Sequence, residues 1–200
     1  MGMIGESGHQ RNRGSIAGIA ARIRLFRRVC VTSFNADSDR CARIQEVLVD
    51  LAGVTGCPAR VGVLRDGWVA FWEAPPGRSA AQPLSVGSVS AQLTALGQLL
   101  LAVAGDGASP EMITRESLSS GPAAHHTRED PTKALMVIRL SGVAIARTPS
   151  PGGTLGVAVP VRDADDRVVA ALELDARDFG QAESVLVDLQ AASRRLSVLG

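Results

Sequence analysis

Two turn sequences, each set between runs of strand-forming residues, constrain the fold of this chain most. Asp66-Gly67 separates residues 59–64 from residues 68–73, and an Asp-Gly pair between two such runs is typical of a tight antiparallel hairpin. An acidic turn at 163–166 joins two further apolar runs in the same way. The sequence therefore predicts a sheet that is built from antiparallel hairpins.

Helices are expected between and beside these hairpins. The apolar spacing of amphipathic helices occurs at about 38–52, 93–103, 131–141 and 179–199. Strands are expected at 59–64, 68–73, 83–86, 143–147, 155–162 and 168–175. This mixture predicts an α+β domain, with a mostly antiparallel sheet flanked by helices.

Charge divides the chain unevenly. The 200 residues are 46% hydrophobic, enough to bury one core. Residues 1–30 hold six arginines and one acid, whereas the rest holds 15 basic and 19 acidic residues. We therefore expect a basic arm at 1–35 with a short amphipathic helix at 15–28, followed by a domain at 36–200. That helix contacts phosphate or, alternatively, packs on the domain or on a second subunit.

Several classes of protein are not supported by the sequence. No apolar run reaches the ~18 residues of a membrane span, and no cleavable leader is evident, so a soluble cytoplasmic protein is expected. Cys30, Cys41 and Cys57 lack CxxC spacing and indicate free thiols in a reducing compartment. No motif for catalysis, for a phosphate loop or for a metal site occurs, so we expect no enzyme, no cofactor and no metal.

Two segments carry a resemblance to a known family. The first, at 86–102, and the second, at 142–174, resemble the effector-binding domain of IclR-type transcription regulators. The positions kept in this chain are Val86, Gly87, Thr94, Ala95, Leu96, Gly97, Leu100, Leu101, Ala102, Gly142, Ala144, Gly153, Ala158, Pro160 and Val161. The resemblance covers roughly residues 37–199 and implies a GAF-like fold. Too few residues precede it for a winged helix-turn-helix, so DNA contact would need a separate or missing domain.

The resemblance also implies a pocket for a small-molecule effector on one face of the sheet. Carried over residue by residue, the effector-binding candidates are Thr94, Ala95, Leu96, Gly97, Leu155, Gly156, Glu173 and Asp175. Free amides at a helix start attract anions, and Gly97 allows close approach of a ligand. Alternatively, Gly97 is a packing point within the core.

Departures from the family pattern bear on the ligand. Gln92, Leu93 and Gln98 stand where relatives often carry His or Lys, which weakens the case for an anionic effector. Glu173 and Asp175 share one face of a strand. If that face lines the pocket, they favour an amine or a polyhydroxy compound; otherwise they form a solvated strand end. Trp68 and Trp72 also share a face, where they stack on an aromatic ligand or belong to the core or a subunit interface.

Three functions remain open. The first is a non-catalytic sensor whose effector changes the docking of a DNA-binding unit, acting as a homodimer or tetramer. The second is a dimerisation or interaction module with a degenerate pocket, blocked by Leu155 or Glu173. The third is a thiol-based redox sensor that uses Cys30, Cys41 or Cys57.

Overall fold

The computed structural model describes residues 38–80, 82, 84–104, 131–148 and 153–197. The expected arm at 1–35, its helix at 15–28 and Cys30 lie outside the described residues. None of the helices within the described ranges combines the length and the apolar character needed to cross a membrane.

Within the described residues, six antiparallel strands form one sheet in the order β3-β2-β1-β6-β5-β4. They are β1 (Ala59–Arg65), β2 (Trp68–Ala74), β3 (Ser85–Ser90), β4 (Ala144–Arg147), β5 (Leu155–Arg162) and β6 (Val168–Ala176). Both expected hairpins are present, β1–β2 and β5–β6. The first turns at Asp66 and Gly67, with φ of 48° and 75°, which is the left-handed conformation that a two-residue hairpin turn requires. The predicted α+β class with an antiparallel sheet is thus confirmed.

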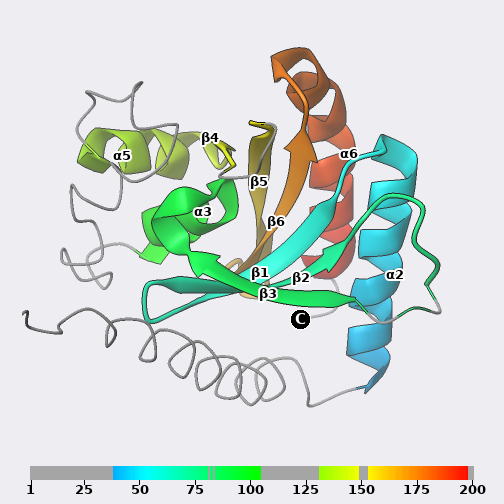
Figure 1. The fold of residues 1–200 in the computed structure, drawn as a ribbon. Coiled ribbons are helices and arrows are strands. Elements are labelled where there is room, and N and C mark those ends of the chain that lie inside the picture. Colours follow the sequence, from blue (N-terminus) through cyan, green and yellow to red (C-terminus); the bar gives the residue numbers. More distant parts are fainter. Residues whose placement is uncertain (1–37, 81, 83, 105–130, 149–152, 198–200) are drawn as a thin grey trace, which may run out of the picture. The chain divides into compact units, whose positions relative to one another are not determined.

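The helices lie on both faces of the sheet (Figure 1). On one face lie α3 (Ala95–Ala104) and α5 (Pro131–Ser141), and on the other lie α2 (Ser38–Thr55) and α6 (Phe179–Ser197). An exposed ion pair joins α6 to α2, with 3.1 Å between Arg195 Nη2 and Asp50 Oδ2. The sheet is therefore the middle layer of three.

Several boundaries differ from the expectation, among them the end of the helix expected at 38–52, which continues to Thr55. The edge strand expected at 83–86 begins at Ser85 and continues to Ser90. The helix expected from Leu93 begins at Ala95, after a 3-10 turn at Ala91–Leu93. The reason is Thr94, whose extended backbone (φ −133°, ψ 154°) breaks the helical path. Its Oγ1 accepts the Gly97 N–H at 3.1 Å, which is the hydrogen bond of a helix N-cap.

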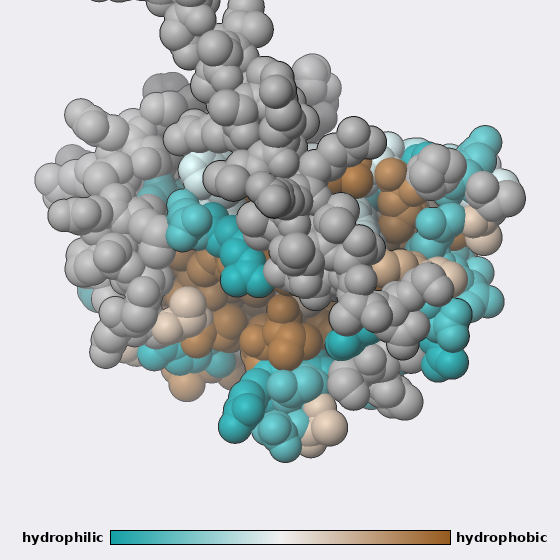
Figure 2. All heavy atoms as spheres, turned by 90° about the horizontal axis from the view of Figure 1, so that it is seen from below, coloured by the Kyte–Doolittle hydropathy of each residue, from teal (hydrophilic) through white to brown (hydrophobic). Residues whose placement is uncertain are grey.

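Hydrophobic packing fills the layers on both sides of the sheet. Leu96 and Leu99 of α3 pack with Ala158 of β5 and Ala171 of β6 in one buried cluster. Because side chains alternate along a strand, the neighbours of these alanines point to the opposite layer, towards α2 and α6. Some hydrophobic side chains stay at the surface, and Figure 2 shows such side chains gathered beside hydrophilic ones on one face of the molecule.

Candidate ligand-binding site

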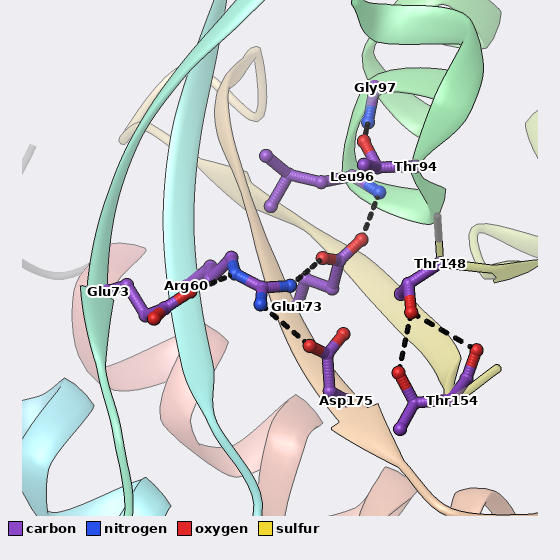
Figure 3. A network of polar contacts seen from close by, with 9 residues as sticks. All are labelled: Arg60, Glu73, Thr94, Leu96, Gly97, Thr148, Thr154, Glu173 and Asp175. Atoms are coloured by element: carbon purple, nitrogen blue, oxygen red, sulfur yellow. Dashed lines mark hydrogen bonds and ion pairs between the residues drawn. The ribbon is translucent and has the colours of Figure 1, made fainter. Parts of the chain in front are cut away.

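One arginine binds three carboxylates on the face of the sheet that α3 covers (Figure 3). Strand register places Arg60 of β1 opposite Glu73 of β2 on one side and opposite Glu173 of β6 on the other. Arg60 Nε lies 2.5 Å from Glu73 Oε2, Nη1 lies 3.1 Å from Glu173 Oε1, and Nη2 lies 2.7 Å from Asp175 Oδ2. The cluster therefore holds three carboxylates and one guanidinium.

Glu173 also seats the first turn of α3. Its Oε2 accepts the backbone N–H of Leu96 at 2.7 Å. This amide is one of those that a helix leaves unpaired at its N-terminus, where the helix dipole favours a negative charge. Gly156 makes room for the carboxyl, because a Cβ added there would lie 3.0 Å from Glu173 Oε2. A side chain of the protein thus occupies the position in which an anion would bind α3.

Burial governs the electrostatics of the cluster. Glu173 is 1% exposed, and desolvation, followed by the charge of Asp175, raises the pKa of its carboxyl from 4.5 to about 7. Arg60 and the Leu96 N–H act in the opposite direction. Burial lowers the pKa of Arg60, but the charges of Asp175 and Glu173 outweigh it, and the net shift is upward. Arg60 stays charged, whereas Glu173 changes its charge near neutral pH.

A chamber of about 220 Å³ lies beside this cluster. We call it the inner chamber; it is lined by Arg60, Phe71, Val89, Thr94, Leu96, Thr148 and Glu173. Its walls are mostly apolar, and the Arg60 guanidinium lies 5.7 Å from the centre of the Phe71 ring. A few polar groups in a mainly apolar hollow are typical of a site for a small molecule.

The structure brings together part of the candidate set. Thr94, Leu96 and Glu173 line the inner chamber, and Gly156 adjoins Glu173. Ala95 is buried, and a Cβ added at Gly156 would lie 3.3 Å from the Cβ of Ala95.

The remaining candidates lie elsewhere. Gly97 packs against the 3-10 turn, where an added Cβ would be 2.1 Å from the Ala91 carbonyl oxygen, so the packing alternative describes its position. Leu155 is one residue from Gly156 on β5, and alternation directs its side chain to the opposite face. Asp175 binds Arg60 but does not line the inner chamber.

The alternative of a solvated strand end is wrong for Glu173 and Asp175. Their exposed fractions are 1% and 7%, and both bind Arg60. Trp68 and Trp72 flank Phe71 at odd spacing on β2, so alternation turns them away from the inner chamber. The sequence therefore predicted that the two acids share one face of a strand, but it did not identify Arg60 as the residue that binds them.

That partner, Arg60, was missed in the sequence. A signal was present: in β1 (ARVGVLR), Ala59, Val61 and Val63 occupy one face, while Gly62 and Leu64 occupy the other. Both faces are thus apolar around a single inner charge, and a charge in such a strand needs a buried partner of opposite sign. Glu173 and Asp175, two apart on another strand, were the matching pair.

Solved structures share this fold. The chain is similar to the C-terminal domain of the Escherichia coli regulator KdgR, with 17% identity, a TM-score of 0.62, and coverage of 80% of this chain and 98% of that one. The Thermotoga maritima IclR is 17% identical, with a TM-score of 0.60 and coverage of 84% of this chain and 70% of that one. An IclR homologue from Microbacterium hydrocarbonoxydans, complexed with 4-hydroxybenzoate, is 20% identical, with a TM-score of 0.61 and coverage of 85% of this chain and 72% of that one. Among the solved structures, a regulator from Rhodococcus sp. RHA1 also matches, and the chain spans 65% of its length.

The sequence comparisons identify the family. No curated protein matches the sequence. Residues 74–198 match the family described as bacterial transcriptional regulator IclR C-terminal. More than half of the chain is covered by this match, and the antiparallel sheet with its flanking helices agrees with it. The chain therefore belongs to the IclR family of bacterial transcriptional regulators, through the family's C-terminal, effector-binding domain.

Proposed function

We propose that the inner chamber is the effector pocket of a regulatory domain, and that its occupancy changes the docking of an attached or partner DNA-binding unit. The observation that carries this proposal is the buried Glu173 carboxyl, which binds both the first turn of α3 and Arg60 of the sheet. A ligand that moves Glu173 changes both contacts at once. It thereby favours one arrangement of α3 against the sheet over another, which is what coupling to a distant partner requires.

The charges favour a ligand without a carboxylate. The Leu96 amide already donates to Glu173, and a ligand carboxylate would face the charge of Glu173 at close range. An amine or a polyhydroxy compound instead adds hydrogen-bond donors to Glu173 and Thr94. In this respect the chain would differ from its Microbacterium relative, which is complexed with the carboxylate 4-hydroxybenzoate.

Three compounds with the same ring separate these possibilities: 4-hydroxybenzylamine, 4-hydroxybenzyl alcohol and 4-hydroxybenzoate. We expect the amine and the alcohol to raise the melting temperature at about pH 8, where Glu173 is charged, and the benzoate to leave it unchanged. A ligand at 100 times its Kd stabilises the fold by about 2.7 kcal/mol, which a thermal-shift assay detects.

Variants show whether the binding is at the inner chamber. Glu173→Gln should weaken the amine and admit the benzoate, because it removes the charge but keeps the shape. Glu73→Gln is the matched control, since Glu73 binds the same arginine but does not line the inner chamber. Equal binding of all three compounds to Glu173→Gln and to the parent would contradict the proposal.

A second candidate function is favoured by the same carboxyl. Glu173 fills the anion position at α3, as expected of a degenerate pocket in a domain that acts by self-association alone. Exposed hydrophobic side chains on α5, Val137 and Leu140, offer a surface for such contacts. Sedimentation equilibrium of the parent and of Leu140→Glu tests it. A dimer that Leu140→Glu weakens, together with no ligand response, would favour this function over sensing.

A further inference from the structure

A second hollow lies at the edge of the sheet where β6 ends and β1 and β5 begin. We call it the outer hollow; it measures about 510 Å³, within the range of small-molecule sites. Residues 55–58, from the last residue of α2 to the start of β1, form one wall, and Thr154, Asp175 and Arg177 form another. Arg60 is the residue that it shares with the inner chamber, and it stands between the two.

Asp175 lines the outer hollow, and one of its carboxylate oxygens has no partner among the described residues. Its Oδ2 binds Arg60 at 2.7 Å, while Oδ1 is buried and accepts no hydrogen bond from the described residues (Figure 3). The residue is 93% buried and lines the hollow. A buried acceptor without a donor is unfavourable, and an N–H of a ligand would remove this cost. The geometry thus calls for a donor at Asp175 Oδ1.

A cation is also present on the wall of the outer hollow. Arg177 is exposed, and its Nε donates to Gln181 Oε1 at 3.3 Å. Arg60 is already engaged by three carboxylates, so Arg177 is the lining arginine that remains for an anionic group of a ligand. A buried acceptor and an exposed guanidinium on one hollow match a molecule that carries both signs of charge.

We propose that the outer hollow binds a small zwitterion of amino-acid type. Its ammonium donates to the Asp175 carboxylate, and its carboxylate pairs with Arg177. A simple amine lacks the second contact, and a simple carboxylate meets the charge of Asp175. This site is separate from the inner chamber, so it stands even if the proposed effector pocket fails.

The test titrates the ¹⁵N-labelled full chain with glycine, β-alanine and 4-aminobutyrate, three zwitterions of increasing length, and with propylamine and propionate as single-charge controls. We expect saturable shifts of the backbone amides of Cys57, Thr154, Arg177 and Gln181 with at least one zwitterion. Those of Leu96 and Gly97, beside the inner chamber, should not move. The amine and the carboxylate should bind about tenfold more weakly, the equivalent of one lost contact of 1.4 kcal/mol.

Arg177→Gln is the decisive variant, because Arg177 is exposed and does not touch the buried cluster. It should reduce zwitterion affinity to that of propylamine. Arg167→Gln, an exposed arginine that does not line the outer hollow, is the matched control and should bind like the parent. The proposal is overturned if no zwitterion gives a saturable shift, if shifts centre on Leu96 and Gly97, or if propylamine binds the parent as tightly as the zwitterions.

Discussion

Glu173 has a carboxyl whose protonation is linked to the stability of the fold. Burial raises its pKa from 4.5 to about 7, so between these values the folded chain holds a proton that the unfolded chain releases. Stability from this group is therefore present at low pH and decreases as pH rises towards the folded pKa. Through this group, a decrease in pH from about 7 towards 4.5 is expected to increase the free energy of unfolding rather than to lower it.

The variant Glu173→Gln should lose this pH dependence. Gln keeps an acceptor for the Leu96 N–H but does not titrate. We expect the free energy of unfolding of the parent, minus that of the variant, to fall by about 2 kcal/mol between pH 5 and pH 8. Urea denaturation at several pH values measures the difference and cancels other titrating groups. A difference that is constant or rises with pH would show that Glu173 is charged throughout.

Removal of Arg60 should be strongly destabilising at neutral pH. Arg60→Met leaves Asp175 and Glu173 buried without a cation, and breaking a buried pair in this way costs about 3–5 kcal/mol. Chemical denaturation at neutral pH gives the value.

Glu73→Gln serves as the comparison, because Glu73 binds the same guanidinium from a 27% exposed position. We expect it to cost less than about 1 kcal/mol, as for surface ion pairs. Similar costs for Arg60→Met and Glu73→Gln would mean that the buried carboxylates do not depend on Arg60.

At the scale of elements, the packing of α3 onto its 3-10 turn depends on a missing side chain. A Cβ at Gly97 would lie 2.1 Å from the Ala91 oxygen and 2.4 Å from its Cα, both backbone atoms that cannot rotate away. Gly97→Ala should therefore destabilise the domain by about 2–4 kcal/mol, despite the higher helix propensity of Ala. The melting temperature would report it.

Gly53→Ala is the matched substitution in a helix. Gly53 lies in α2, is exposed, and has open space where the Cβ would go. Without a clash, propensity alone acts, and we expect Gly53→Ala to stabilise the fold by about 0.5–1 kcal/mol. If both variants shifted the melting temperature in the same direction, the contact at Ala91 would not be the cause.

Local sequence signals were sufficient for most elements and not for the site. Asp66-Gly67 determined a hairpin because its turn chemistry acts over two residues. The start of α3 was predicted two residues too early, at Leu93. The apolar pattern does not distinguish the capping residue Thr94 from the first residues of the helix. The Arg60 cluster joins residues 113 apart in sequence, and such a contact follows from strand order, which no local pattern contains. The family motif implied that both Leu155 and Gly156 line the pocket, although consecutive residues of a strand face opposite sides of the sheet.

At the scale of the whole molecule, the sheet is the layer that joins both helical layers, and its strands differ in depth. Most of β6 is buried between β1 and β5, whereas β3 forms an edge with its residues exposed or half-buried. Arg60 and Glu173 bind the central strands to α3. Cooperative unfolding should therefore centre on β1, β5 and β6.

Hydrogen exchange of the backbone amides measures this directly. We expect the amides of β6 to exchange only through global unfolding, and those of β3 through local opening with a free energy at least about 2 kcal/mol lower. Arg60→Met should lower the free energy of exchange in β6 towards that in β3, since it weakens the centre and leaves the edge contacts intact. Glu73→Gln should leave the difference between β6 and β3 unchanged. Equal protection of β3 and β6 in the parent would mean that the sheet opens as one unit, and that the Arg60 cluster does not define its most stable part.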